Sequence, residues 1–495
     1  MTAHDEPMRG AAPPASGRTL LDMSGYQWTV LAAAWLGWGF DAFDAILFNF
    51  VAPNCVPTLL GLAIGSPAAK AATLLWTGVL TSLLLLGWAA GGILFGQVAD
   101  RLGRTRTLRL TMLVYALGTA ACALAPNLWV LVLFRAVASL GIGGEWAAGA
   151  AMVAEVVPEK RRVEAGALLY TAAPLGLFLA TFVNYQIAGS LLAADPELSW
   201  RFVFLAGLIP AAVALVVRRF IREPERWRQA TTAGAAAPAG GAAAGAAAAG
   251  ATLAAGGAAA GGAAARAAAA GGAAPRPRLA ELFDREHRAL TLSGFLMAVV
   301  VLVTWWSCNA FIPVVATGLA QATAKARALD RAGTLALVEH WKAVATTYFN
   351  LGGLLGTLLT VPFAKRLGRR PMFAIYYAAA AAAILATFGL DLAPETRLAM
   401  YFLIGLTIFG VFGSFTYYLP ELFPTRLRGT GAGFCYNVGR IIAAAGPVLV
   451  GGIAARGANS LASALQALFY VGFVPLAALL FLPWVIETRG RPLAD

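Results

Sequence analysis

Charged residues are scarce in this chain. Of its 495 residues, only 12% are Asp, Glu, Lys or Arg, whereas 59% are hydrophobic, and the mean hydropathy is +0.72. Soluble domains usually carry about a quarter charged residues and about 45–50% apolar ones. A soluble enzyme of this size is therefore not expected. The composition favours a helical membrane protein with many spans over a single-span receptor or a porin.

Cysteine and histidine are also too few for a disulfide scaffold or a metal site. The four cysteines form no C-x-x-C pair, and the three histidines lie far apart in the sequence. The chain also lacks the Gly-x-x-x-x-Gly-Lys-Ser/Thr loop of ATP-driven pumps and the Gly-x-Ser-x-Gly and His-Glu-x-x-His motifs of hydrolases. We therefore expect no enzyme activity, no cofactor and no metal.

Apolar runs long enough to cross a membrane occur twelve times. They lie at 27–51, 74–97, 108–125, 128–153, 164–188, 201–218, 289–317, 341–364, 372–391, 396–419, 432–455 and 464–485. The fold is thus expected to be an all-α membrane protein with twelve transmembrane helices. Between the seventh and eighth runs, residues 318–340 are expected to form an amphipathic surface helix.

Two charged motifs each occur twice, once in each half of the chain. Asp100-Arg-Leu-Gly-Arg104 follows the second run, and Lys365-Arg-Leu-Gly-Arg369 follows the eighth, at an offset of 265. A second set of Glu, Pro and Arg repeats at an offset of 266, as Glu155, Pro158 and Arg162 and again as Glu421, Pro424 and Arg428. These repeats predict two related six-helix bundles, an architecture common among secondary transporters.

The runs and the charges together predict the domain boundaries and the orientation. We expect cytoplasmic tails over 1–26 and 486–495, six-helix bundles over 27–218 and 289–485, and a cytoplasmic linker with an Ala/Gly-rich tract over 219–288. With the N-terminus inside, 27 of the 37 Lys and Arg residues fall on the cytoplasmic side, as the positive-inside rule requires. The net charge of +13 therefore indicates membrane topology rather than nucleic-acid binding, and the expected location is the inner or plasma membrane.

Several of these motifs resemble the major facilitator superfamily, over the whole chain outside the tails and the linker. Gly96-Gln-Val-Ala-Asp-Arg-Leu-Gly-Arg104 resembles the signature loop after helix two of that family. Arg222-Glu-Pro-Glu-Arg-Trp227 and Glu487-Thr-Arg-Gly490 resemble the loops that follow helices six and twelve in sugar-porter-like members. The resemblance implies the major facilitator fold. The second signature loop departs from the pattern, because Lys365 stands where the first half has Asp100.

Two further stretches narrow the resemblance. Asp41-Ala-Phe-Asp44, followed by Phe50-Val-Ala-Pro53, resembles helix one of aromatic acid:proton symporters. Arg135, followed by Gly141-Ile-Gly-Gly-Glu-Trp146, resembles the sialate and lactate:proton symporter group. The resemblance implies a proton-coupled carrier of an organic acid, such as lactate, pyruvate, sialate or an aromatic acid.

Charged residues inside the predicted spans are the strongest functional signal, because such residues usually line a transport pathway. Asp44 in the first run and Arg135 in the fourth both lie about 10 Å below the outer membrane surface. They can pair if the two helices adjoin, as the family resemblance implies. Protonation of Asp44 would then free Arg135 for a substrate carboxylate, with Asp41 as a second proton-coupling candidate. The alternative is a permanent structural ion pair.

Arg440 lies near the middle of the eleventh run without an obvious acidic partner in its half of the sequence, so an anionic substrate could supply the missing charge. Polar and aromatic residues at similar depth are further substrate-binding candidates, although each of them could serve only helix packing. These are Asn184, Gln186, Trp305, Asn309, Asn350, Tyr417 and Asn437.

Charged residues at the inner ends of the spans resemble the salt-bridge gate of the family. The predicted cytoplasmic gate consists of Asp100, Arg101, Arg104, Glu155, Arg162, Arg369, Glu421 and Arg428. Breaking such a gate lets the two halves rock relative to each other.

The sequence therefore predicts a secondary active transporter that moves a small organic acid together with protons by alternating access. Its expected partners are that organic anion, protons and the lipid bilayer, without nucleic acid, and it is expected to work as a monomer. Two alternatives remain open: a proton-coupled porter of a sugar or another neutral metabolite, and a proton/substrate antiporter that exports a metabolite or a drug.

Overall fold

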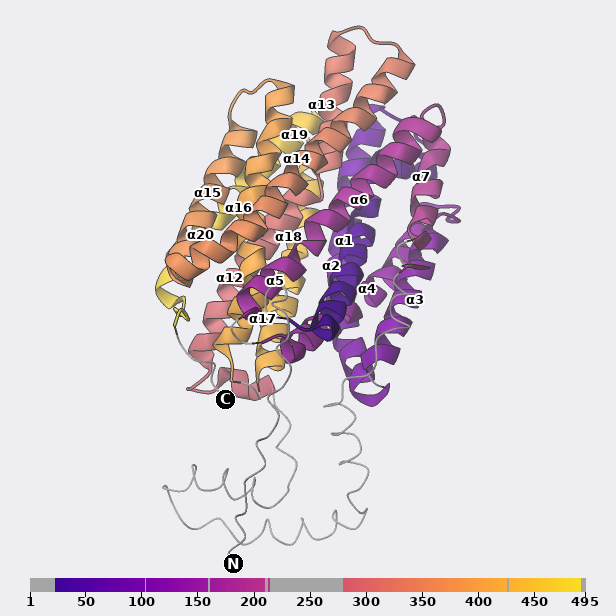
Figure 1. The fold of residues 1–495 in the computed structure, drawn as a ribbon. Helices are drawn as coiled ribbons and strands as arrows, with labels where there is room; N and C mark the ends of the chain where they lie inside the picture. Colours follow the sequence, from indigo (N-terminus) through magenta and orange to yellow (C-terminus); the bar gives the residue numbers. More distant parts are fainter. Residues whose placement is uncertain are drawn as a thin grey trace, which may run out of the picture.

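The computed structural model of the chain describes residues 23–102, 104–158, 161–209, 212–213, 279–424 and 427–490. Every regular element in these ranges is helical, and the long helices run side by side in an elongated bundle (Figure 1). The N-terminal half contains α1 (Gly25–Leu60), α2 (Pro67–Leu102), α3 (Arg104–Cys122), α4 (Leu128–Val156), α5 (Arg162–Tyr170), α6 (Ala172–Gln186), the π-helix η3 (Ile187–Leu191) and α7 (Pro196–Ala206).

The C-terminal half is built in the same way. It contains η4 (Leu279–Phe283), α12 (Arg288–Asn309), α13 (Ile312–Ala326), α14 (Arg331–Arg366), α15 (Arg369–Gly389), α16 (Pro394–Leu422), α17 (Arg428–Ala443), α18 (Ala445–Arg456), α19 (Ser460–Val471), α20 (Val474–Phe481) and η5 (Leu482–Trp484). Figure 1 shows these helices beside those of the N-terminal half.

These helices coincide with the predicted apolar runs. Within the described ranges, nine helical stretches are long and apolar enough to cross a membrane. Two shorter apolar helices, Arg109–Cys122 and Leu128–Gly143, fall on the third and fourth runs. The sixth run begins in α7, but residues 210–211 and 214–218 lie outside the described part, as does most of the linker. The prediction of an all-α, multi-pass membrane protein is confirmed.

The expectation of a separate surface helix over 318–340 is wrong. The helix α13 continues to Ala326, and α14 already begins at Arg331. Asp330 caps α14, because its side-chain oxygen accepts a hydrogen bond of 2.7 Å from the backbone N–H of Gly333. With 36 residues, α14 is about 54 Å long, so it reaches well beyond the bilayer core of about 30 Å.

Two helices are interrupted at matching places in the two halves. In the fifth predicted span, α5 gives way to α6 at Thr171, three residues before Pro174. In the eleventh, α17 gives way to α18 at Ala444, three residues before Pro447. Proline has no N–H to donate, and its ring crowds the preceding turn, which explains both interruptions. Interrupted helices at corresponding positions of two repeats indicate where a transporter binds its substrate.

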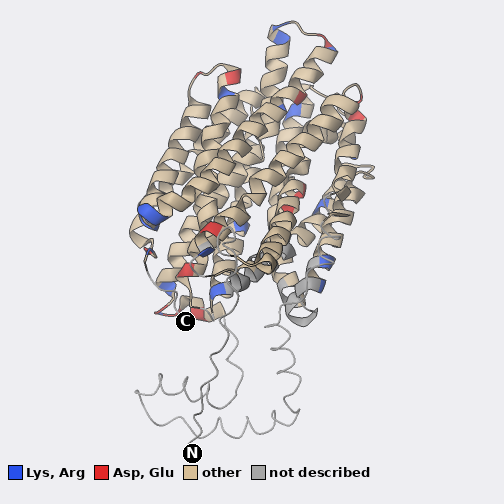
Figure 2. Cartoon of the chain, viewed as in Figure 1, with Lys and Arg blue, Asp and Glu red and all other residues tan. Residues whose placement is uncertain are grey.

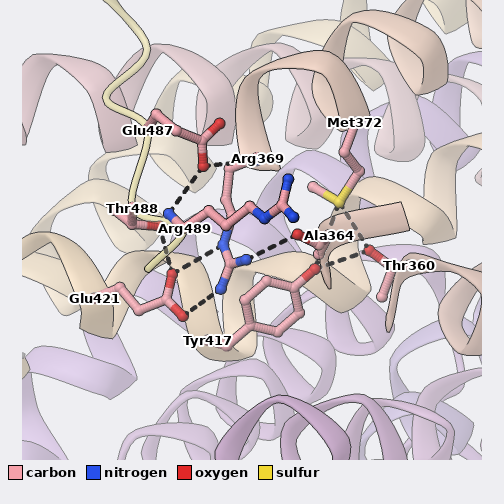
Figure 3. A network of polar contacts seen from close by, with 9 residues as sticks. All are labelled: Thr360, Ala364, Arg369, Met372, Tyr417, Glu421, Glu487, Thr488 and Arg489. Carbon is pink, nitrogen blue, oxygen red and sulfur yellow. Dashed lines mark hydrogen bonds and ion pairs between the residues drawn. The ribbon is translucent and has the colours of Figure 1, made fainter. Parts of the chain in front are cut away.

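At the end of the molecule where α16 ends, polar contacts connect the last described residues to α15 and α16 (Figure 3). We call the group formed by Arg369, Glu421, Glu487 and Thr488 the clasp. Arg369 donates from Nε and Nη2 to the Glu421 carboxylate, at 3.1 and 2.7 Å. Thr488 donates from Oγ1 to the same carboxylate. The Glu487 carboxylate accepts hydrogen bonds from the backbone N–H groups of Arg369 and Arg370, at 2.9 and 3.0 Å. The clasp thereby fixes the C-terminal segment to two helices of its own half.

The clasp changes the titration of Glu487. Partial burial raises the pKa of its carboxyl group, but the backbone N–H groups of Arg369, Arg370 and Arg489 and the charge of Arg369 together hold that pKa below its ordinary value. The ionised form of Glu487 therefore stabilises the fold above the pH at which the unfolded carboxyl group titrates. This contribution is lost as the pH falls through the lower pKa of the folded state.

Glycine lets α14 and α16 pack backbone to backbone. A Cβ atom added at Gly356 of α14 would lie 2.0 Å from the carbonyl oxygen of Leu406. One added at Gly405 of α16 would lie 2.0 Å from the carbonyl oxygen of Phe349. Small residues allow such close approach between membrane helices, so the position of α14 depends on them.

We expect Gly356→Ala to lower the thermal unfolding midpoint of the detergent-purified protein by several degrees. The added methyl group forces the two helices apart, and overpacking of this kind costs about 1–3 kcal/mol. Gly452→Ala is the matched control, because an added Cβ atom meets nothing within 4 Å there. Equal unfolding midpoints for the two variants would show that the close contact contributes nothing.

We expect Glu487→Gln to lower the unfolding midpoint at neutral pH, because glutamine cannot supply the negative charge that the clasp holds. The difference from the wild type should shrink as the pH falls below 4.5, the ordinary value for Glu, and through the lower pKa of the folded state. Asp391→Asn, at an exposed carboxylate, serves as the control. A difference independent of pH would contradict a role for the charge.

Candidate functional site

Charged side chains in this protein gather mainly at the ends of the bundle, and few lie in its middle (Figure 2). The sequence analysis singled out four charged residues within the predicted spans: Asp41 and Asp44 on α1, Arg135 on α4 and Arg440 on α17. Their exposed fractions are 0%, 1%, 2% and 3%. Because a buried charge is costly unless it is paired, the partners of these four residues determine what the site can do.

Asp44 and Arg135 lie next to each other, as predicted. Nη1 of Arg135 is 3.9 Å from Oδ2 of Asp44, and Nη2 of Arg135 donates to the carbonyl oxygen of Ala45 at 3.3 Å. Arg135 thus keeps a backbone acceptor that does not depend on the charge of Asp44. The predicted proximity of Asp44 and Arg135 is confirmed. That this ion pair takes part in proton coupling remains a prediction.

Arg440 lies against two aromatic rings where the halves meet. Its guanidinium carbon is 4.1 Å from the ring centroid of Trp88 on α2 and 4.5 Å from that of Tyr436 on α17, both within cation–π range. Nη1 donates to Oδ1 of Asn437 at 3.2 Å. Asp41 of α1 also interacts electrostatically with Arg440. An acidic side chain of the other half is therefore close enough to Arg440 to influence it electrostatically, although less than Tyr436 and Tyr170 do.

An aromatic cluster surrounds this cation. Tyr170, the last residue of α5 before its interruption, is stacked on Phe412 of α16 with ring centroids 5.9 Å apart. Trp305 lies 6.0 Å from the same Phe412 ring and 4.4 Å from Trp306, which in turn lies 6.0 Å from Trp88. We call Trp88, Tyr170, Trp305, Trp306, Phe412 and Tyr436 the aromatic cluster. It combines residues from both halves and places flat apolar groups around a buried positive charge.

Two predicted asparagines of the C-terminal half remain available for a ligand. Asn309 is 5% exposed and Asn350 is 1% exposed. Among the described residues, Nδ2 of Asn309 and both side-chain atoms of Asn350 have no hydrogen-bond partner, and the same holds for Nε1 of Trp305. Leaving buried polar atoms unpaired is unfavourable, so a polar ligand that supplied the missing partners would be stabilised here.

Three of the predicted substrate contacts lie elsewhere. The side chain of Gln186 is exposed at the end of α6. Tyr417 shares a hydrogen bond of 3.0 Å with Thr360 and lies beneath Arg369, at the clasp. Asn184 donates to a glutamate near the start of α14. Residue position along a run gives only approximate depth, and a role of these three side chains in substrate binding stays a prediction.

Of the predicted gate residues, Arg369 and Glu421 form the clasp, and Arg428 donates from Nε to the carbonyl oxygen of Pro420 at 3.1 Å. These contacts stabilise the C-terminal half, and the role of Arg369, Glu421 and Arg428 in a gate between the halves stays a prediction. The side chains of the other five lie outside the described part of the structure: Asp100, Arg101, Arg104, Glu155 and Arg162.

A contact between the halves at the clasp end involves residues that were not predicted. Lys365, near the end of α14, donates from Nζ to the Glu164 carboxylate of α5. Arg161 lies 3.8 Å from the same carboxylate. The sequence feature that could have indicated this contact is Lys365 itself, which departs from the repeated motif. Its partner, Glu164, lies in the other half. Glu339 and Lys342 of α14 were also missed, because they fall at the edge of an apolar run.

The comparisons with known proteins agree with this architecture. Residues 34–447 match the Major Facilitator Superfamily. The chain is 29% identical over 461 residues to the "Probable 4-methylmuconolactone transporter" of Cupriavidus pinatubonensis, which covers 92% of this chain and 90% of the relative. It is 26% identical over 442 residues to the gentisate transporter of Corynebacterium glutamicum, with coverages of 88% and 83%.

A solved structure supports the fold independently. The crystal structure of a D-xylose-proton symporter matches with a TM-score of 0.68 and 18% sequence identity, over 95% of this chain and 100% of that one. At this low sequence identity, the similarity between the two proteins bears on the fold alone. Repeated motifs, matching helix interruptions and the family match all indicate a membrane transporter rather than an enzyme. On this evidence, the chain belongs to the Major Facilitator Superfamily.

Proposed function

We propose that this protein is a proton-coupled symporter of small organic anions that works by alternating access and prefers planar aromatic carboxylates. The observation that carries the proposal is the position of Arg440, buried where the halves meet and lying against Trp88 and Tyr436. A buried guanidinium suits a carboxylate, and the surrounding rings suit a flat apolar body. The relative named for gentisate supports the same class of substrate.

Asp41 gives this site a way to couple anions to protons. Its carboxylate interacts with Arg440, so a substrate carboxylate and ionised Asp41 compete for one cation. Protonation of Asp41 removes the competitor and favours substrate binding. By linkage, a bound substrate favours the protonated form of Asp41 to the same degree. Proton and anion therefore bind together, which is the condition for symport.

Asp44 and Arg135 supply a second proton-sensitive pair within the N-terminal half. Ionised Asp44 holds Arg135 at 3.9 Å, and protonation leaves Arg135 with the Ala45 carbonyl oxygen as acceptor. Freed from its ion pair, Arg135 can attract an approaching carboxylate. The unpartnered polar atoms of buried Asn309 and Asn350 offer hydrogen bonds to polar substituents of the substrate, as Asn437 does beside Arg440.

The membrane arrangement belongs to the same proposal. Bundles over 27–218 and 289–485, joined by the 219–288 linker, rock around the site. The tails over 1–26 and 486–495 lie in the cytoplasm, because 27 of the 37 Lys and Arg residues then face inward. Since Asp41 and Arg440 come from the two halves of one chain, a monomer in the inner or plasma membrane suffices.

Asp41→Asn tests the role of the proton that is coupled to the anion. In proteoliposomes with an inward proton gradient, we expect the wild type to accumulate a benzoate-type acid. The variant should equilibrate it without accumulation, because it cannot bind and release the coupling proton. Counterflow exchange should persist, since exchange needs no net proton movement. A structural brace would instead lower exchange and accumulation together, and wild-type uptake that ignores the gradient would rule out symport.

Arg440→Gln tests the recognition of the anion. We expect the KM for an aromatic carboxylate to rise about tenfold or more, because losing a charge-assisted hydrogen bond costs about 1.5–3 kcal/mol. Arg456→Gln, at an exposed arginine of the same half, is the control. The substrate panel should contain lactate, pyruvate, sialate, a benzoate-type acid and a neutral sugar. Transport of the sugar alone, or an unchanged KM, would refute anion recognition by Arg440.

A further inference from the structure

A second pair of buried charges lies away from the Arg440 site, near the start of α14. Nζ of Lys342 is 2.6 Å from Oε1 of Glu339, and the two residues are 0% and 5% exposed. Because they are three residues apart on one helix, they project from the same face. Lysine and glutamate are rarely buried to this extent unless they are paired. The ion pair explains how the two charges can be buried. Their hydrogen bonds to other residues indicate their role.

Each member of the pair also reaches across to the N-terminal half. Lys342 donates from Nζ to the carbonyl oxygen of Phe50 on α1, at 3.3 Å. Asn184 of α6 donates from Nδ2 to Oε2 of Glu339, at 3.0 Å. A backbone carbonyl oxygen has two lone pairs, so the Phe50 carbonyl can accept from Lys342 in addition to its bond within α1.

A third hydrogen bond lies beside these two. Thr181 of α6 donates from Oγ1 to Oγ1 of Thr346 on α14, at 3.1 Å. Thr346 follows Lys342 by one turn of α14. The polar contacts therefore form a continuous strip between α14 and the helices of the other half. All three hydrogen bonds are buried, and separating the halves at this end breaks all of them.

We propose that Glu339, Lys342 and Asn184 form a latch that closes the halves against each other at the end opposite the clasp. The ion pair lies within α14, so it moves with the C-terminal half and stays intact when the latch opens. Opening breaks only hydrogen bonds that involve at least one uncharged group: those to the Phe50 carbonyl and from the Asn184 amide, and the one between the Thr181 and Thr346 hydroxyls. An ion pair shared between the halves would instead leave two separated charges, which is far more costly. The latch therefore holds the closed state and still releases reversibly.

The place of the latch in the molecule fits alternating access. Lys365, 23 residues further along the same helix, contacts Glu164 of the N-terminal half, about 35 Å away from the latch. One rigid helix thus joins the other half at both of its ends. The Lys365 side chain is 47% exposed, so salt screens that contact, whereas the buried latch is protected from screening. The latch therefore controls the opening of its own end.

The latch is tested by measuring how far the two halves separate at this end. Spin labels are attached at Leu191→Cys, after α6, and at Leu329→Cys, before α14, both of which are exposed. The natural cysteines, Cys55, Cys122, Cys308 and Cys435, are replaced by Ser in this background. Distances between the labels are then recorded by pulsed electron paramagnetic resonance in lipid nanodiscs.

We expect Asn184→Leu to raise the population with the longer label distance at least threefold. The double variant Glu339→Leu/Lys342→Met should do the same, and it leaves no unpaired charge to prevent folding. Arg327→Gln is the matched control, because it breaks a 3.0 Å ion pair with Glu395 at the same end but within one half. Its distance distribution should equal that of the parent.

Parent-like distributions for Asn184→Leu or for the folded double variant would overturn the latch, as would an equal shift in the Arg327→Gln control. The two latch variants act on opposite sides of the contact, so either one decides the question if the other does not fold. The measurement contains neither substrate nor proton gradient. Its outcome is therefore independent of whether the protein is a proton:anion symporter.

Discussion

A charge buried in a membrane protein must meet a partner, and this requirement organises the whole structure. Arg440 lies against one aromatic ring from each half, and the charge of Asp41 in the other half acts on it more weakly. Arg135 is held by Asp44 within its own half. The two arrangements differ in consequence, because only a pair shared between the halves senses their relative movement. In the proposed mechanism, Arg440 is therefore the residue at which substrate charge and conformation are linked.

The helices that present these charges combine rigid and interrupted segments. Glycines bring α14 and α16 into backbone contact and make that half a firm support. The interruptions before Pro174 and Pro447 instead fall beside Tyr170 and Arg440, next to the aromatic cluster. Local bending there can change the surroundings of Arg440 without disturbing the packing of α14 against α16. Firm helices carry the movement between the ends, and interrupted ones shape the site.

The two ends of the molecule are closed by different physical means. At the clasp end, partly exposed charges such as Lys365 and Glu164 pair across the halves in contact with water. At the opposite end, Glu339 and Lys342 neutralise each other within one helix and offer hydrogen bonds to the other half. Water and ions can replace the first kind of contact easily, whereas the second is released by rigid separation of the halves. Because of this difference, salt and water affect the contact at the clasp end, whereas the opposite end opens only when the halves separate.

Hydropathy and repeated motifs determined the all-α fold, the apolar runs and the buried charges of α1, α4 and α17, because these depend only on local sequence. Tertiary structure alone decided which charges meet. The Asp41–Arg440 interaction, the burial of Lys342 and the place of Tyr417 at the clasp depend on how deep each helix sits and which face it turns inward. Depth and rotation are set by packing between helices distant in sequence, so no local pattern records them.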